Sequence, residues 1–293
     1  MRRELGLPDH IPIQYDDNGW DSRVYLVNRG EAVFKFPRSP EAKTQYRREI
    51  AVLQMLAALN SPVRVPRIQW CQPDLEWFGY QGVVGEQLSY RLPDLDSSTK
   101  IAIGHALGRF LRQFHACHVD APPTVPIDAE IANYQAKYRL ASAALERLSP
   151  SERAMAQWFF FDILPREMRR SGGELRLTHG DLGPWNVILT DDLQVGVIDL
   201  GDACYQDPSR DFAGYSDEII FHAALEAYGA DDWLREKAWL RIKAFPILDI
   251  PFYLGKNDEP GIQWCLDLVR RLIVRGERTA QRPLHPAVYR PEQ

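Results

Sequence analysis

The chain has 293 residues, of which 45% are hydrophobic and 26% are charged. This length can bury a substantial core in one large domain or two lobes, and the composition excludes a mostly disordered chain. With 35 Lys and Arg against 40 Asp and Glu, the formal charge is −5, which argues against a general nucleic-acid-binding protein.

The four cysteines are spread widely along the sequence, at positions 71, 117, 204 and 265. This spacing favours buried thiols in a reducing compartment over a disulfide framework or a local metal site. The first residues lack the apolar stretch of a signal peptide, and no uncharged apolar run approaches the roughly 18 residues that span a bilayer. We therefore expect a cytoplasmic protein that binds neither membranes nor nucleic acid. We also expect a monomer, although no sequence feature addresses the oligomeric state.

The N-terminal part of the chain predicts a strand-rich lobe with one helix. Residues 24–27 and 32–36 are strand-like, and the turn-like Asn28-Arg29-Gly30 separates them. Residues 40–59 carry apolar side chains at helical spacing, and a second pair of strands is expected between residues 65 and 84. We assign this nucleotide-binding lobe and its hinge to residues 1–85.

After Gly85 the pattern changes to long helices. Helical spacing is clear around residues 103–114, 129–148 and 151–170, and again from residue 212 onward. Three short strands, residues 175–178, 187–189 and 195–198, interrupt the helices, and Asp191-Asp192 forms a turn between the last two. The sequence therefore predicts an α+β fold with a helical C-terminal lobe over residues 86–293 and a cleft between the lobes.

The strongest chemical signal comes from Asp181, Asn186 and Asp199. Asn186 lies five residues after Asp181, and Asp199 follows the strand 195–198. The oxygen atoms of Asn186 and Asp199 can bind a hard cation such as Mg²⁺, which leaves Asp181 to face a substrate hydroxyl. A single Asp near a turn is usually a cap or turn former, but two such segments in this order favour a kinase-type site.

Lys35 and Glu49 are the candidate phosphate-binding residues of the N-terminal lobe, and they complement the motif of Asp181, Asn186 and Asp199. Lys35 lies in a strand, where burial would be unfavourable without an anionic partner, and Glu49 lies in the following helix. An ion pair with Glu49 could direct Lys35 toward the α- and β-phosphates of a nucleotide. Glu49 alone would be interpreted as a solvated helix charge, but together with the later motif the ion pair is the better interpretation.

The loop that would cover the phosphates is less distinctive. Residues 16–23 contain one glycine, Gly19, and do not form a glycine-rich GxGxxG loop. Backbone N–H groups near Gly19 and the hydroxyl of Ser22 could contact phosphate, although a plain hairpin turn explains the segment equally well.

These segments together resemble the aminoglycoside phosphotransferase family, and within it the 2″-phosphotransferases. The family shares the protein-kinase-like two-lobed fold. The matching segments span most of the chain but are short: residues 25–37, 79–85, 179–186, 198–202, 207–212 and 252–256.

The resemblance implies a role for each matching residue. Asp181 would be the catalytic base or would orient the acceptor hydroxyl, Asn186 and Asp199 would be the Mg²⁺ ligands, and Lys35 would anchor the phosphates. Asp211 would brace the catalytic loop.

The resemblance also implies a hinge at residues 80–84, which bind the nucleotide base. Tyr80, Gln81 and Val83 are the candidate contacts, and a Tyr at the position of Tyr80 favours GTP over ATP as the cosubstrate. The sequence departs from the family pattern at Leu200, where Phe is more usual, and in its glycine-poor phosphate loop.

The charge distribution gives information about the acceptor. Residues 199–260 contain 13 Asp and Glu but 6 Lys and Arg, a local charge of −7, whereas the first 70 residues sum to +3. A carboxylate-rich region attracts a polycation such as an aminoglycoside. Asp217, Glu218 and Trp264 match acceptor contacts of the related kinases, although helical acids are usually solvated and a Trp usually packs in the core.

Three functions are compatible with the sequence. The first is a Mg²⁺-dependent kinase that transfers the γ-phosphoryl group of GTP or ATP to an aminoglycoside hydroxyl and so confers resistance. The second is a kinase of the same fold for another small alcohol, such as a macrolide, choline, homoserine or a sugar. The third is a non-catalytic nucleotide-binding module, which the presence of Asp181, Asn186 and Asp199 disfavours. A protein kinase is disfavoured because no Ala-Pro-Glu segment follows Asp199.

Overall fold

The computed structural model describes residues 10–17, 21–170, 174–215 and 217–279. Gly19 lies outside these ranges. The chain forms two compact units: unit 1 comprises Met1–Leu95, Cys117–Pro122 and His179–Ala203, and unit 2 comprises Asp96–Ala116, Pro123–Thr178 and Cys204–Gln293. Within the described ranges, no helix is both long and apolar enough to cross a membrane.

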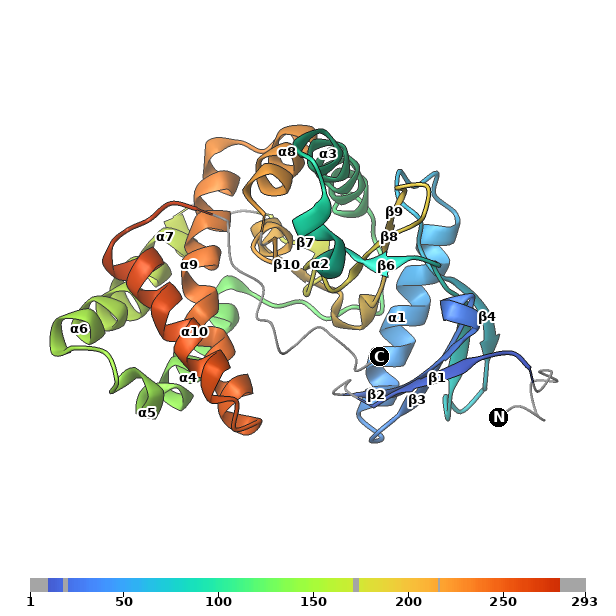
Figure 1. Ribbon diagram of the computed structural model, residues 1–293, viewed down its shortest axis with the longest axis horizontal. Coiled ribbons are helices and arrows are strands. Elements are labelled where there is room, and N and C mark those ends of the chain that lie inside the picture. The colour runs from blue at the N-terminus through green and yellow to red at the C-terminus, as the bar shows by residue number, and fades with distance from the viewer. Residues whose placement is uncertain (1–9, 18–20, 171–173, 216, 280–293) are drawn as a thin grey trace. The chain divides into compact units, whose positions relative to one another are not determined.

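Unit 1 is built on a five-stranded antiparallel sheet with the strand order β1-β2-β3-β5-β4 (Figure 1). The strands are β1 (Ile13–Asp16), β2 (Ser22–Val27), β3 (Ala32–Pro37), β4 (Arg67–Cys71) and β5 (Phe78–Gln81). The predicted turn of residues 28–30 joins β2 to β3, and Val27 pairs with Ala32 across it. The two predicted strand pairs are therefore confirmed, and β1 adds an edge strand that the sequence pattern did not reveal.

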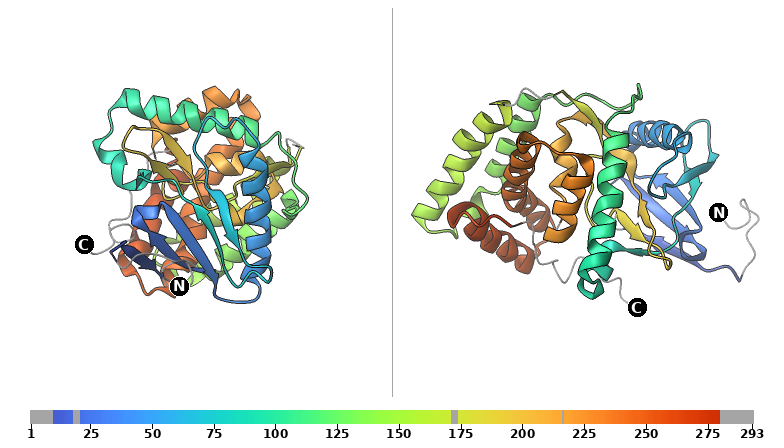
Figure 2. Two further views of the ribbon diagram at one scale, coloured as in Figure 1. Left: turned by 90° about the vertical axis from the view of Figure 1, so that its right-hand side faces the viewer. Right: turned by 90° about the horizontal axis from the view of Figure 1, so that it is seen from above.

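Helix α1 (Ala42–Ala57) is the helix predicted over residues 40–59, and it lies along this sheet (Figure 2). Its buried face carries Tyr46, Val52, Leu53 and Leu56. The Tyr46 ring meets Phe78 of β5 edge-on, with the ring centroids 4.7 Å apart. This packing fixes α1 against the strands that carry Lys35 and Tyr80.

A second, smaller sheet completes unit 1. It has the order β6-β8-β9, formed by β6 (Glu86–Gln87), β8 (Val187–Leu189) and β9 (Val195–Val197). The short helix α2 (Leu88–Arg91) follows β6. In the β8–β9 hairpin Val187 pairs with Val197, so Asn186 and the residues after Val197 lie at the same end of the hairpin.

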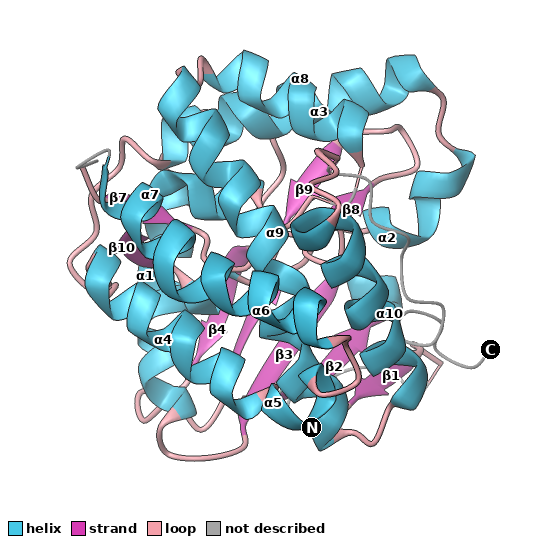
Figure 3. Cartoon of the chain, turned by 90° about the vertical axis from the view of Figure 1, so that its left-hand side faces the viewer, coloured by secondary structure: helices cyan, strands magenta, loops and turns pink. Residues whose placement is uncertain are grey.

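Unit 2 is mainly helical (Figure 3). Helices α3 (Ser97–Phe114) and α8 (Glu218–Tyr228) pack side by side, and α9 (Asp232–Gly255) packs against α10 (Glu259–Val269) and α4 (Ile127–Leu140). The remaining helices are α5 (Ser142–Leu145), α6 (Pro150–Trp158) and α7 (Leu164–Arg170). The strands β7 (Arg176–Thr178) and β10 (Cys204–Gln206) form an antiparallel pair.

Two helices expected from the sequence are divided in the structure. The stretch 129–148 breaks at Ala141, between α4 and α5, and the stretch 151–170 passes through a π-helical turn at Phe159–Ile163 between α6 and α7. Several helix starts have clear local causes, because an N-terminal side chain accepts a backbone N–H in each case. These capping residues are Asp96, Ser149, Asp217, Asp231 and Asp258.

Candidate active site

Lys35 is the centre of a buried ion-pair cluster in unit 1. Its Nζ lies 2.9 and 2.7 Å from the two carboxylate oxygens of Glu49 and 2.8 Å from Oδ1 of Asp199. Lys35 is 7% exposed and Glu49 is 1% exposed. The expected ion pair is therefore present, and Glu49 is not a solvated surface charge.

The charges of this cluster shift its ionisation. Burial would lower the pKa of Lys35, but the carboxylates of Asp199 and Glu49 outweigh it and hold that pKa well above its usual value. The Lys35 ammonium group in turn lowers the pKa of Asp199. Both Lys35 and Asp199 are consequently charged at neutral pH, as a phosphate anchor and a cation ligand need to be.

Asp181 lies in the loop between β7 and β8, where hydrogen bonds fix its carboxylate. Trp185 Nε1 donates to Asp181 Oδ2 at 3.1 Å, and Asn186 Nδ2 donates to the same oxygen at 3.0 Å. Asn186 Nδ2 also donates to the backbone oxygen of Asp181 at 2.9 Å. Since the amide nitrogen of Asn186 faces Asp181, its amide oxygen is directed elsewhere and can serve as a cation ligand.

His179 joins this loop to the strand that leads to Asp199. The side chain is fully buried, and Nε2 lies 2.9 Å from the backbone oxygen of Ile198. Nδ1 accepts the backbone N–H of Asp181 at 3.3 Å. These contacts require the tautomer that carries its proton on Nε2.

Gly180 has a structural reason to be glycine. Its φ of +85° lies in the left-handed region, and a Cβ there would be 2.4 Å from the backbone oxygen of Asp202. The loop bearing Asp181 therefore approaches the segment after Asp199 more closely than any side chain at position 180 would permit.

Asp199 follows β9 and stands beside Asn186. The backbone N–H of Ile198 donates to the backbone oxygen of Asn186 at 3.0 Å, which brings the two segments together. Asp199 has φ 62° and ψ 66°, a left-handed conformation that is uncommon for a non-glycine residue and recurs at functional sites. Its side chain is 53% exposed although it contacts Lys35, so the carboxylate remains accessible to a ligand.

The candidate base-pocket residues lie at the end of β5 and beyond. Val33 pairs with Tyr80 and Lys35 pairs with Phe78, so these four side chains share one face of the sheet. Tyr80 is buried, which raises the pKa of its hydroxyl. Gln81 is exposed and Val83 is half-buried.

Ser22 begins β2 and is buried, with 8% exposure. Its Oγ accepts a hydrogen bond from the hydroxyl of Tyr46 on α1 at 2.9 Å. This contact joins the start of β2 to α1, and a contact between Ser22 and phosphate stays a prediction.

The three candidate acceptor residues have different environments in unit 2. Asp217 is buried, caps α8, and accepts a hydrogen bond from Lys100 Nζ at 2.9 Å. Glu218 is partly exposed and accepts a hydrogen bond from Thr279. Trp264 is half-buried beside Tyr253, with the rings 6.3 Å apart.

Glu218 lines a pocket of about 520 Å³ in unit 2. The other lining residues are His222, Leu225, Asp232, Arg235, Glu236, Trp239 and Arg278. Two arginines, Arg235 and Arg278, offset its three carboxylates, and Arg278 pairs with Glu236, so the pocket carries little net negative charge. The guanidinium of Arg278 also lies 5.5 Å from the centroid of the Trp239 ring.

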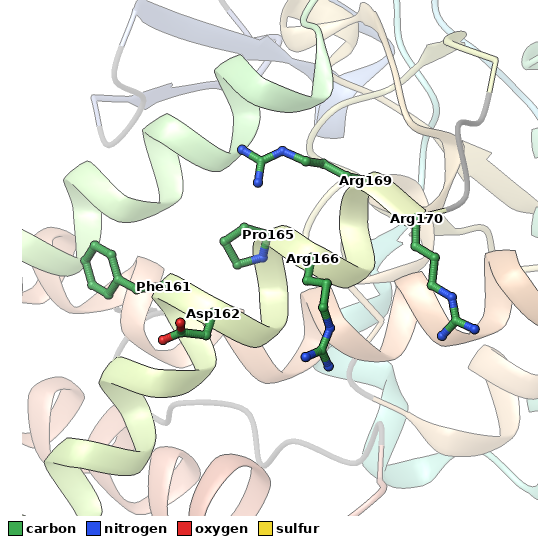
Figure 4. Close-up of a pocket in the computed structure, with 6 residues that line it drawn as sticks. All are labelled: Phe161, Asp162, Pro165, Arg166, Arg169 and Arg170. Carbon is green, nitrogen blue, oxygen red and sulfur yellow. The ribbon is translucent and has the colours of Figure 1, made fainter.

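A second pocket, of about 550 Å³, lies along α7 and is lined by Arg166, Arg169 and Arg170 (Figure 4). Arg169 extends to the side opposite Arg166 and Arg170. Arg166 and Arg170 both bind Glu167, and Arg169 binds Asp128. The guanidinium groups therefore diverge and are matched by carboxylates, so they do not converge on one bound group.

The sequence interpretation did not identify several contacts around these residues. Trp185 and His179 stand inside the motif, yet only the folded loop shows that they contact Asp181. Arg48, next to Glu49, donates to the backbone oxygen of Gly201 at 3.0 Å. Asp211, the predicted brace, is fully buried, and its Oδ2 lies 3.0 Å from Nε2 of His115.

The sequence profile of the phosphotransferase enzyme family matches residues 13–245, which is most of the chain. The chain belongs to this family. It is therefore a phosphotransferase, and the resemblance found in its motifs is confirmed. A comparison with curated protein sequences gave no significant match.

Solved structures with the same fold include several antibiotic kinases. The GDP and kanamycin complex of APH(2″)-IIia has 23% identity, covers 91% of this chain and 94% of that chain, and has a TM-score of 0.71. ADP-bound APH(2″)-Ib has 20% identity, coverage of 95% and 97%, and a TM-score of 0.64. Macrolide 2′-phosphotransferase MphH from Brachybacterium faecium has 20% identity, coverage of 92% and 95%, and a TM-score of 0.63.

These similarities confirm the predicted α+β, protein-kinase-like fold, with a small antiparallel sheet in the N-terminal part and helices in the C-terminal part.

Proposed function

We propose that the protein is a Mg²⁺-dependent kinase that transfers the γ-phosphoryl group of a nucleoside triphosphate to a hydroxyl group of an aminoglycoside. The observation that carries this proposal is the arrangement within unit 1. Lys35 is held by Glu49 and lies next to Asp199, which follows β9. Asn186 contacts both the end of β9, through the backbone of Ile198, and the carboxylate of Asp181. This set combines a phosphate anchor, two oxygen ligands and a carboxylate for the acceptor.

Each residue has a defined task in this reaction. Lys35 binds the α- and β-phosphates, which compete with Asp199 for its ammonium group. Asp181 accepts a hydrogen bond from the acceptor hydroxyl and orients its oxygen toward the γ-phosphorus. The nucleotide base binds at Tyr80, Gln81 and Val83, and Gly19 and Ser22 are the candidate contacts for the phosphates.

The donor atoms present suit Mg²⁺. Asn186 directs its amide nitrogen inward, and the Asp199 carboxylate stays accessible. One amide oxygen and one carboxylate are the few protein ligands that Mg²⁺ commonly takes when phosphate oxygens and water complete its shell. When bound, the ion would neutralise charge on the phosphates.

The proposal also specifies the acceptor and the nucleoside triphosphate. An aminoglycoside is supported by the charge of −7 over residues 199–260, and Asp217, Glu218 and Trp264 are its candidate contacts. Of these, Glu218 is partly exposed and lines a pocket in unit 2. A Tyr at position 80 supports GTP over ATP, and phosphorylation of the antibiotic would confer resistance.

The alternative is a macrolide as the acceptor, because macrolide 2′-phosphotransferase MphH has the same fold. A macrolide carries less positive charge and more apolar surface, so it would gain little from the carboxylates around Glu218. The two classes of acceptor differ in charge, so comparing turnover with aminoglycosides and with macrolides distinguishes the two proposals.

The test is release of GDP or ADP across a panel of aminoglycosides and macrolides, with GTP and ATP each supplied with Mg²⁺. We expect aminoglycoside-dependent release that is faster with GTP and is abolished in Asp181→Asn. Release with macrolides alone would replace the proposed acceptor, and no response to any acceptor would refute the antibiotic-kinase proposal.

A further inference from the structure

Trp185 stands beside the candidate catalytic residue but belongs to none of the roles described above. It lies between Pro184 and Asn186 in the loop that carries Asp181, and its side chain is half-buried. Its indole Nε1 donates to Oδ2 of Asp181 at 3.1 Å. An indole nitrogen is a donor only, so this contact has one direction.

The carboxylate of Asp181 thus receives two donors on one oxygen. Asn186 Nδ2, from the next residue of the loop, reaches the same Oδ2 at 3.0 Å. A single hydrogen bond would allow the carboxylate to turn about its terminal torsion, which has broad minima. Two donors converging on Oδ2 fix the plane of the group, and therefore the direction in which Oδ1 points.

The indole itself is held in place by its surroundings. A Cβ at Gly183 would lie 2.4 Å from Cζ2 of Trp185, so the ring lies directly against the backbone of Gly183. The backbone oxygen of Pro184 accepts the N–H of Ser89 at 3.1 Å, which ties the loop to α2. The contact with Gly183 and the anchored Pro184 backbone together restrict the position of the tryptophan ring.

We propose that Trp185 is a positioning residue for phosphoryl transfer, and that its indole N–H holds the Asp181 carboxylate in the orientation that receives the acceptor hydroxyl. The inference rests on the proposed function, in which Asp181 contacts that hydroxyl. Trp185 acts through Asp181, and within the part of the chain that the structure describes its side chain forms no hydrogen bond with Lys35 or Asp199. Its loss should therefore affect kcat and spare nucleotide binding.

The first test is Trp185→Phe, which keeps an aromatic ring and removes the donor. Hydrogen bonds to charged groups are worth enough to change a rate about 10- to 100-fold, and we expect kcat at the lower end because Asn186 still binds Oδ2. The KM for the nucleotide should stay within about twofold of wild type. Trp158→Phe is the matched control, since Trp158 is 55% exposed in unit 2, and it should leave both constants unchanged.

A second variant, Gly183→Ala, keeps the indole N–H but forces the ring out of its position, because the added Cβ would lie 2.4 Å from the ring. We expect the same fall in kcat with an unchanged KM for the nucleotide. A kcat within twofold of wild type in Trp185→Phe, or an equal rise in the nucleotide KM, would overturn the inference.

A spectroscopic test separates this inference from the proposed acceptor. The indole ¹H–¹⁵N resonance of Trp185 is assigned by its loss in Trp185→Phe, and we expect it to move in Asp181→Asn. If the wild-type protein phosphorylates no aminoglycoside, the proposed function fails. The resonance still tests whether the indole N–H of Trp185 donates to Asp181. A resonance that is unmoved in Asp181→Asn would overturn the inference whatever the acceptor is.

Discussion

At the scale of single residues, the Lys35 cluster shows how one cation can serve two carboxylates in different environments. Glu49 is 1% exposed and depends on Lys35, whereas the Asp199 side chain is 53% exposed and can be solvated. In the proposed reaction, a phosphate group that replaced Asp199 at Lys35 would leave no buried charge without a partner, because Glu49 would keep the ammonium group in place.

This asymmetry leads to a prediction for Lys35→Met. The substitution leaves the Glu49 carboxylate buried without its cation, so we expect a loss of about 3–5 kcal/mol in the free energy of unfolding. The double variant Lys35→Met with Glu49→Gln should recover most of that stability but remain inactive. Urea denaturation measures the first effect and nucleotide turnover the second. Equal stability of the single and double variants would show that Glu49 is solvated in the folded state.

At the scale of elements, residues that are close in sequence were the most predictable. The loop from His179 to Asn186 and the β8–β9 hairpin are short, so their motifs determine where Asp181, Asn186 and Asp199 lie. The contact between Asp217 and Lys100 could not be predicted, because the two residues are 117 positions apart. The hydrogen bond from Trp185 to Asp181 could not be predicted for another reason. It depends on the orientation of the indole ring, which the absence of a side chain at Gly183 permits.

The tight loop at Gly180 gives a prediction with a matched control. Gly180→Ala forces a Cβ into the left-handed region and toward the Asp202 oxygen 2.4 Å away. We expect a loss of about 1–3 kcal/mol in stability and a fall in kcat, because the displaced loop carries Asp181. Gly229 has a similar φ of +80°, but a Cβ there would have no atom of the described residues within 4 Å. Gly229→Ala should therefore lose about 1 kcal/mol in stability with kcat unchanged.

Asp207 links the 3₁₀ helix Pro208–Phe212 to α9 through buried ion pairs. It is 4% exposed and binds Lys237, and Arg241 lies 3.9 Å away. Burial would raise the pKa of Asp207, but the charges of Arg241 and Lys237 outweigh it and hold that pKa below its usual value. The carboxylate therefore contributes stability at pH values above its unfolded pKa of about 3.9, and this contribution disappears as the pH falls through the lower folded pKa.

We accordingly expect Asp207→Asn to be destabilised by about 3–5 kcal/mol at pH 7, because Asn preserves the cap of Ser209 but leaves Lys237 without its counter-ion. The difference from wild type should shrink as the pH falls below about 4. Denaturation curves at pH 7 and pH 3 measure the difference in the free energy of unfolding between the two proteins. A difference that is independent of pH would contradict the assigned ion pair.

At the scale of the whole molecule, the charge count of residues 199–260 overstates their negative field. Several of these carboxylates contact cations from elsewhere in the chain: Asp199 with Lys35, Asp217 with Lys100, Glu236 with Arg278 and Glu259 with Arg147. The attraction for a polycationic acceptor is therefore weaker than the sum of −7 indicates.

The last prediction concerns the stability of the molecule as nucleotide binds. A ligand at 100 times its dissociation constant stabilises the folded state by about 2.7 kcal/mol, which raises the Tm by about 5 °C for a chain of this size. We expect this shift with GDP and Mg²⁺, a smaller one with ADP, and little shift when EDTA is present. Asp199→Asn should lose the dependence on Mg²⁺ but keep its folding transition, because the Asp199 side chain is half exposed. A shift in Asp199→Asn that still requires Mg²⁺ would place the ion on other residues and would remove the main support for a kinase-type metal site.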